Sequence, residues 1–160
     1  MIKLFLSSLL SFLLVSCNTS SENASETLTT EEITFTKQGE LQIYKADSTT
    51  EALNIEFAET DYETATGLMY RDAMEENQGM LFIFGSPSVH SFYMKNTEFS
   101  LDILYLTEDQ KIATIAANAK PFSEESLSSE VPIQYALEIK GGMAEKWNVK
   151  VGDSVSWTKE

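Results

Sequence analysis

The sequence predicts an α+β domain that is mainly β: a compact, antiparallel, barrel-like sheet with one or two short helices. Apolar residues alternate with polar ones in several short segments, for example at Leu53, Ile55 and Phe57, and this period of two is typical of half-buried strands. The chain has no regular succession of strand, helix and strand, which disfavours a parallel sheet. Its 160 residues, 42% of them hydrophobic, are enough for one domain with a core.

The first strands and the first helix follow from local patterns. Alternating residues around 41–43 and 53–57 predict paired strands that open the domain. Thr60 and Glu63 have the spacing of a capping box, and apolar residues then recur at helical intervals. We therefore expect a helix over residues 61–74, with Gly67 inside it and packed closely on the sheet.

The run from Met80 to Phe84 is apolar at every position, which predicts a central strand buried on both faces. Turn residues at 85–87 end it. The remaining elements are expected in the following order: strands over 91–96, 101–107 and 111–116, an exposed loop over 118–132, a strand around 135–139, a short helix over 143–148 and a last strand around 155–157.

Residues 1–16 have the pattern of a signal peptide. Lys3 precedes an apolar run, Leu4 to Val15, that is too short to span a membrane comfortably. The run ends in Leu-Val-Ser-Cys17, which resembles a lipobox, the motif at which bacterial lipoproteins are cut before a diacylated cysteine. We expect Cys17 to be the lipid attachment site. The alternative is an ordinary secretory signal with an incidental cysteine.

Residues 17–38 are rich in Ser, Thr, Asn and Glu and are predicted to be the lipidated N-terminus and a flexible linker. A single globular domain is predicted over 39–160. Acyl chains give stable membrane association, so the first expected partner is the lipid membrane, through Cys17. The protein is expected to be exported and membrane-anchored. In a Gram-negative bacterium it would be sorted to the outer membrane, because Asn18 rather than an acidic residue follows the cysteine.

Composition excludes several functions. A net charge of −14 disfavours binding to nucleic acid, because phosphate contacts need clustered Lys and Arg. One cysteine allows no internal disulfide, and one histidine, His90, leaves too few ligands for a zinc site. His90 also has no nucleophile elbow to serve, so we interpret it as a loop or strand-edge residue. The methionines fit a core better than a copper site. We expect no metal and no cofactor.

The segment from Gly67 to Ile103 carries the most specific pattern. It reads GLM-x-R, then GMLF-x-F, SF-x-MKNT and LDI. This pattern resembles the bacterial and archaeal family called domain of unknown function 192, over about residues 40–158. The resemblance implies a compact, β-rich fold but no particular reaction or ligand. Ser100 is a departure, because the family commonly has proline there.

Five polar residues at positions that the family pattern marks are candidates for a site: Arg71, Lys95, Asn96, Asp102 and Glu138. Asp102 and Glu138 lie in otherwise apolar strands, so each should be partly buried and should need a partner. One interpretation is a single polar pocket on the sheet. The other is structural: Asp102 pairs with Lys95 or Arg71, or fixes a turn. Because Lys95 and Asp102 flank one short loop, we expect these two to be coupled.

Two classes of function remain. The first, which we favour, is a non-enzymatic envelope module that binds a partner protein, a glycan or a small anion. The second is a hydrolase or lyase acting on envelope polysaccharide, in which Asp102 and Glu138 are acid and base and Lys95 or Arg71 stabilises negative charge. Carboxylates about 5–10 Å apart across an open cleft would favour the second class. The sequence assigns no catalytic residue.

The lipobox generates the first prediction. Cys17→Ser should remove lipidation and membrane partitioning, because the thiol is the only acyl acceptor in the motif. Incorporation of radiolabelled palmitate measures this in cells. Equal labelling of the wild type and the variant would contradict the lipoprotein interpretation.

Overall fold

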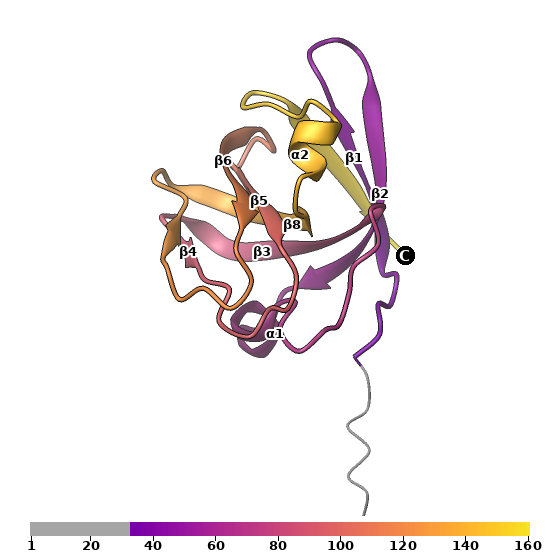
Figure 1. Ribbon diagram of the computed structural model, residues 1–160. Helices are drawn as coiled ribbons and strands as arrows, with labels where there is room; N and C mark the ends of the chain where they lie inside the picture. Colours follow the sequence, from indigo (N-terminus) through magenta and orange to yellow (C-terminus); the bar gives the residue numbers. More distant parts are fainter. Residues whose placement is uncertain (1–32) are drawn as a thin grey trace, which may run out of the picture. The chain divides into compact units, whose positions relative to one another are not determined.

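A computed structural model describes residues 33–160 of the chain (Figure 1). The predicted signal peptide, Cys17 and most of the predicted linker lie outside this part. The helices among the described residues are short: α1 (Asp61–Thr66) and α2 (Met143–Lys146). The strands are β1 (Gly39–Tyr44), β2 (Thr50–Ala58), β3 (Gln78–Ser88), β4 (Ser91–Phe92), β5 (Leu101–Leu106), β6 (Ile112–Ala119), β7 (Leu127–Ser128), β8 (Ile133–Lys140) and β9 (Ser154–Lys159). The predicted class, α+β and mainly β, is confirmed.

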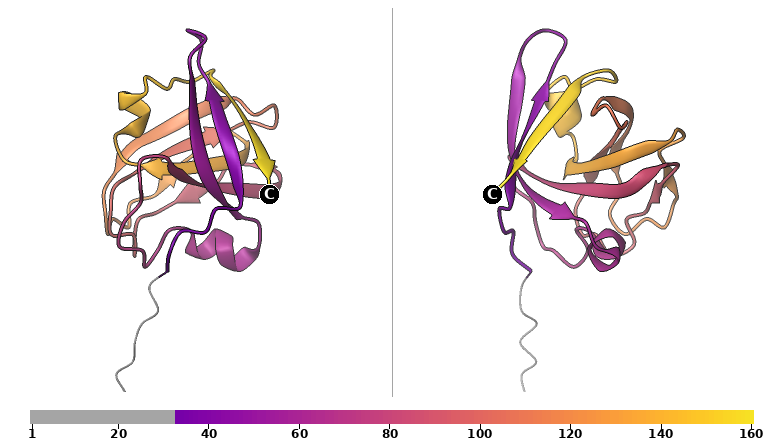
Figure 2. Two further views of the ribbon diagram at one scale, coloured as in Figure 1. Left: turned by 90° about the vertical axis from the view of Figure 1, so that its right-hand side faces the viewer. Right: turned by 180° about the vertical axis from the view of Figure 1, so that it is seen from behind.

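Seven strands form one sheet in the order β6-β5-β8-β3-β2-β1-β9, and β4 pairs with β7 in a small second sheet. The large sheet is curled (Figure 2). Its two edge strands meet at one end, where Lys111 forms an isolated bridge with Ser154. Apart from this one bridge the edge strands β6 and β9 do not pair, so the barrel-like prediction is correct only as a half-barrel. The sheet is also not wholly antiparallel, because β2 and β3 are parallel neighbours joined by a crossover that contains α1.

The curled sheet separates two hydrophobic cores. The inner core fills the curl and includes Leu104 and Leu137, whereas the outer core includes Ile103 and Ala136 on the same two strands. All of β5 is buried, and so is most of β8, because both strands have a core on each face. The expected central position of the strand containing Met80 to Phe84 is confirmed, since β3 is the middle strand of the seven.

The first helix begins as expected and ends early. Thr60 Oγ1 accepts a hydrogen bond from Glu63 N (3.2 Å) and Glu63 Oε2 accepts one from Thr60 N (2.9 Å), so the capping box is present. The helix ends at Thr66 rather than at residue 74, because Gly67 has φ +49° and leaves the helical region. A Cβ on Gly67 would lie 3.0 Å from Cζ of Phe82. The expected close packing of this glycine on the sheet is confirmed, but its place inside a helix was wrong.

Other elements differ in length from the prediction. The strand expected over 91–96 shortens to β4, because Thr97 N donates to the carbonyl of Met94 in a turn. The loop expected over 118–132 contains β7. Contacts with the sheet begin before residue 39, since Thr36 N donates to Glu56 Oε1 (2.9 Å). In the described part of the chain, neither helix is long and apolar enough to cross a membrane.

The backbone at Gly67 generates the second prediction. Gly67→Ala should destabilise the domain by about 1–3 kcal/mol, because alanine disfavours this backbone conformation and its methyl group would press on Phe82. Gly85→Ala is the matched control, since nothing lies within 4 Å of a Cβ at that position. Denaturant unfolding measures both. Equal stability of the two variants would contradict the assigned role of Gly67.

Candidate functional site

Strand register places two buried carboxyl groups in one row on the outer face of the sheet. Glu56 on β2 is opposite Met80 on β3, and Met80 is opposite Glu138 on β8. The row continues to Ile103 on β5. Met80 and Ile103 belong to the outer core, so Glu56 and Glu138 project on the same side. Two strand spacings of about 4.8 Å separate their backbones by roughly 10 Å.

Arg71, from the loop after α1, neutralises one of these two carboxylates. Its Nη1 lies 2.6 Å from Oε2 of Glu56, and both side chains are almost buried. Breaking such a buried pair is costly, because the remaining charge would lack a partner. Glu56 Oε2 accepts no hydrogen bond in the described chain, but it has the counter-charge of Arg71, and Glu56 Oε1 accepts a hydrogen bond from Thr36 N.

Glu138 has no comparable partner. It is 5% exposed, and in the described chain its Oε2 is buried without a hydrogen bond. Burial raises the pKa of this carboxyl to about 8, and the positive charge of Arg71 offsets only part of the effect. Glu138 is thus mostly protonated at neutral pH. A buried acid with an unused oxygen is costly to a fold, and such groups concentrate at functional sites.

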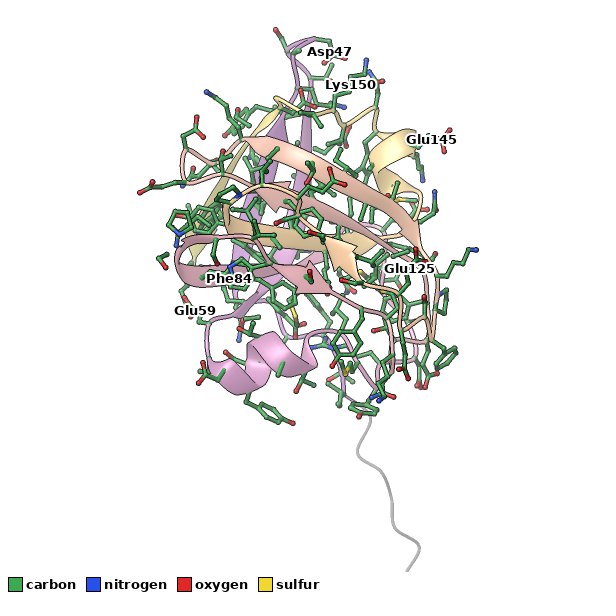
Figure 3. All side chains as sticks on the ribbon, turned by 90° about the vertical axis from the view of Figure 1, so that its left-hand side faces the viewer. Asp47, Glu59, Phe84, Glu125, Glu145 and Lys150 are labelled. Carbon is green, nitrogen blue, oxygen red and sulfur yellow. The ribbon has the colours of Figure 1, made fainter. Side chains whose placement is uncertain are left out.

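A pocket of about 270 Å³ opens over Glu138. One wall is the C-terminal end of α1 and the residues that follow, and the opposite wall is aromatic. Phe84 and Phe92 form a corner, with ring centroids 6.4 Å apart and planes at 70°. Figure 3 shows Phe84 on β3 above α1. The pocket is lined by Thr64, Ala65, Thr66, Gly67, Leu68, Met69, Phe84, His90, Ser91, Phe92, Tyr93, Thr97 and Glu138.

His90 belongs to the aromatic wall. Its ring stacks on Phe84, with centroids 3.6 Å apart and planes at 16°, and its Nε2 is 2.8 Å from Oγ of Ser88. Burial lowers the pKa of the imidazole below its ordinary value, so the ring is mostly neutral at pH 7. It lies just before β4, at a strand edge as the sequence suggested, but it also covers one side of the candidate site.

Asp102 lies on the opposite face of the sheet from Glu138. It is directly opposite Ile139, an inner-core residue, and it is fully buried. Its Oδ1 accepts a hydrogen bond from Asn118 N (2.7 Å) and its Oδ2 accepts one from Ala144 N (2.8 Å). The carboxylate therefore connects β6 to the first turn of α2, where a negative charge also suits the helix dipole. The structural interpretation of Asp102 is the one that these contacts support.

The expected acid and base pair of Asp102 and Glu138 is wrong, because Asp102 is paired across the strands with Ile139, the neighbour of Glu138 on β8, and neighbouring residues of a strand project to opposite faces. The expected coupling of Lys95 to Asp102 is also wrong. Lys95 is exposed, with its Nζ 3.7 Å from Glu124 Oε1. Asn96 lies in the same loop, where its Nδ2 donates to the hydroxyl of Tyr70 (2.8 Å).

Of the five predicted site residues, Arg71 acts on the charge of Glu138, whereas Lys95 and Asp102 are bound elsewhere. Asn96 contacts Met69 and Tyr70, just before Arg71 in the chain. Glu56 was missed, although an acid between Ile55 and Phe57 in an apolar strand was a usable signal. The aromatic wall was also missed, because Phe84 and Phe92 read as ordinary core residues. In the described chain, no three His, Cys, Asp or Glu side chains cluster as metal ligands would.

The fold and the pocket define a small β-rich module with one candidate site on the outer face of a half-barrel. The chain matches the model of the domain of unknown function 192 family, described as an uncharacterized ACR, over residues 42–157. It therefore belongs to that family.

Two solved structures are similar. A Sinorhizobium meliloti 1021 protein, provisionally described as a transcription regulator, has 35% identity and a TM-score of 0.74, and the match covers 79% of this chain and 97% of that one. A protein of unknown function from Novosphingobium aromaticivorans DSM 12444 has 35% identity and a TM-score of 0.71, over 74% of this chain and 84% of that one. No curated protein matches the chain.

The contacts of Asp102 generate the third prediction. Asp102→Leu should destabilise the domain by roughly 2–5 kcal/mol, because two buried N–H groups lose their acceptor. Lys95→Met should change stability by less than about 1 kcal/mol, as its ion pair is exposed. The double variant should be additive within about 0.5 kcal/mol in denaturant unfolding. A larger coupling energy would contradict the separation of these residues.

Proposed function

We propose that this protein is a lipid-anchored envelope module that binds a small ligand in the pocket over Glu138 and does so without catalysis. The observation that carries the proposal is the buried, unpartnered carboxyl of Glu138 at an open pocket. Pockets that combine an apolar lining with a few directed polar groups are typical ligand sites. Placement at the membrane depends on the lipobox at Cys17, which lies outside the described residues.

Binding is favoured over hydrolysis because, among residues 33–160, no second carboxylate is available to work with Glu138. Glycoside cleavage ordinarily needs an acid and a second carboxylate on either side of the scissile bond. Asp102 is on the other face with both oxygens occupied, and Glu56 is held by Arg71. Glu138 at a pKa of about 8 can donate or release one proton, which serves recognition without a paired base.

The charges around the pocket limit the chemical classes of ligand that can bind there. A small anion is disfavoured, because Arg71 already pairs with Glu56 and Lys95 is exposed beside Glu124. Nucleic acid is disfavoured by the net charge of −14, so the description of the Sinorhizobium relative as a transcription regulator finds no support in this chain. A neutral or cationic group, carried by a glycan or by a partner protein, fits better.

Binding can be tested by NMR with a library of cell-wall oligosaccharides and muropeptides. Shifts should concentrate on Met69, Phe92 and Glu138, and Ala65→Trp should reduce them, because an indole at this exposed position of α1 would cover the pocket. Glu125→Gln is the control, because this exposed residue does not line the pocket. Shifts that persist in Ala65→Trp would place binding elsewhere and contradict the proposal.

The pKa of Glu138 generates the fourth prediction. A carboxyl with a higher pKa in the folded chain contributes stability that is present below its unfolded value, roughly 4.3, and is lost as the pH rises to about 8. The free energy of unfolding should therefore fall by up to about 1.4 kcal/mol per pH unit between pH 5 and 8 from this group. Glu138→Gln should flatten that decline.

Denaturant unfolding of wild type, Glu138→Gln and Glu125→Gln over this pH range measures the effect. Glu125 is exposed, so its variant should keep the slope of the wild type. Parallel curves for wild type and Glu138→Gln would contradict a raised pKa at Glu138.

A further inference from the structure

We propose that the ligand of this pocket is a small organic cation, an ammonium or quaternary ammonium group that sits against Phe84 and Phe92 and pairs with the carboxylate of Glu138. This inference rests on the proposed binding function and adds the chemical class of the ligand. Three features carry it: the aromatic wall, the unpartnered acid at the floor, and the lack of any Lys or Arg among the residues that line the pocket.

The aromatic wall supplies side chains of the kind that hold cations. The faces of aromatic rings attract cations, and cages of aromatic side chains bind quaternary ammonium groups. Phe84 and Phe92 line the pocket as an edge-to-face pair, with planes at 70° and centroids 6.4 Å apart, and Tyr93 also lines it. The wall is held in place from behind, because Phe92 also packs edge-to-face on Phe82, with centroids 5.0 Å apart.

The acid at the floor lacks a counter-charge that a cation would supply. The Oε2 atom of Glu138 is buried and has no hydrogen bond in the described chain. The cation nearest to it, Arg71, is already paired with Glu56 at 2.6 Å. A ligand cation at the pocket would complete a second buried ion pair, whereas an anion would meet an acid with no compensating base.

Apart from the Arg71–Glu56 ion pair, two titratable side chains near Glu138 are mostly neutral at pH 7. Tyr105, from β5, has its pKa raised by burial and by the nearby Glu138 carboxylate, so its hydroxyl stays protonated. His90, above the pocket, has its pKa lowered by burial and is mostly neutral at pH 7. Among the residues that line the pocket, Glu138 is thus the one that becomes charged, and only its deprotonated form suits a cation. The net charge of −14 also favours approach of cations over anions.

Binding must release a proton. Protonated Glu138 and a free cation give a carboxylate–cation pair and one proton to solvent, so charge balances. With a pKa of about 8, the apparent affinity should rise roughly fiftyfold from pH 6 to pH 8 and level off above it. A neutral ligand that accepts a hydrogen bond from the protonated acid would behave in the opposite way, since it would lose its donor above pH 8.

Choline and 3,3-dimethyl-1-butanol form a matched pair of probes, because they have nearly the same shape and only choline is charged. Isothermal titration of the domain with each, at pH 6, 7, 8 and 9 and in buffers of different ionisation heat, measures affinity and proton release together. Choline should bind more tightly and should release about 0.9 proton at pH 7. Glu138→Gln should abolish the pH dependence of the affinity for choline and lower that affinity at least tenfold at pH 9. Phe92→Leu should reduce the preference for choline, and Glu125→Gln should change nothing.

The outcomes separate this inference from the proposed function. Equal or tighter binding of the neutral probe would overturn the cationic ligand while supporting a binding pocket. Choline binding that survives both Glu138→Gln and Ala65→Trp would occur elsewhere and would also overturn it. If neither probe binds, the cation class is wrong for this pocket. The proposed function fails only if the cell-wall library gives no shifts at the pocket as well.

Discussion

The structure depends on one constraint: the central strands of the half-barrel are buried on both faces. Side chains alternate between faces along a strand, so each polar residue on β5 or β8 must find its partner in one particular core. Asp102 projects into the inner core and finds two backbone N–H groups. Glu138, on the neighbouring strand, projects into the outer core and finds none for its Oε2. Two acids in similar apolar strands therefore differ: Asp102 is fully hydrogen-bonded within the fold, whereas Glu138 keeps an oxygen without a partner.

Glu138 is tolerated in the outer core because its carboxyl group is protonated at neutral pH. Two carboxyl groups and one guanidinium lie in this region, and Arg71 stands 2.6 Å from Glu56. If both acids were ionised, the buried group would carry a net negative charge, which desolvation makes costly. Protonation of Glu138 removes that cost but leaves an acid where an apolar residue would pack more favourably. Groups retained against stability in this way are characteristic of sites rather than of scaffolds.

Local patterns in the sequence predicted the fold class, the start of α1 and the central strand, because capping and hydrophobic period act over a few residues. They did not predict that α1 ends at Gly67, where the backbone turns to φ +49° and packs closely against Phe82 from a strand met later in the chain. Nor could they assign Asp102 and Glu138 to different faces, which needs the register of β5 against β8. The pairing of Lys95 with Asp102 was predicted from their closeness along the chain, but Lys95 lies in an exposed turn and its ammonium group is near Glu124.

The position of the pocket follows from an interruption in the same sheet. β3 pairs with β8 regularly up to Ile83, and the register then shifts before Ser88. Such irregularities re-aim side chains and occur often beside functional sites. Phe84 lies within the shift, where its carbonyl accepts a hydrogen bond from the side chain of Gln134 instead of a regular ladder bond. The pairing of β3 with β8 is thus regular at Glu138 and irregular after Ile83, so the acid projects from a regular part of the sheet and the aromatic wall begins where the pairing is interrupted.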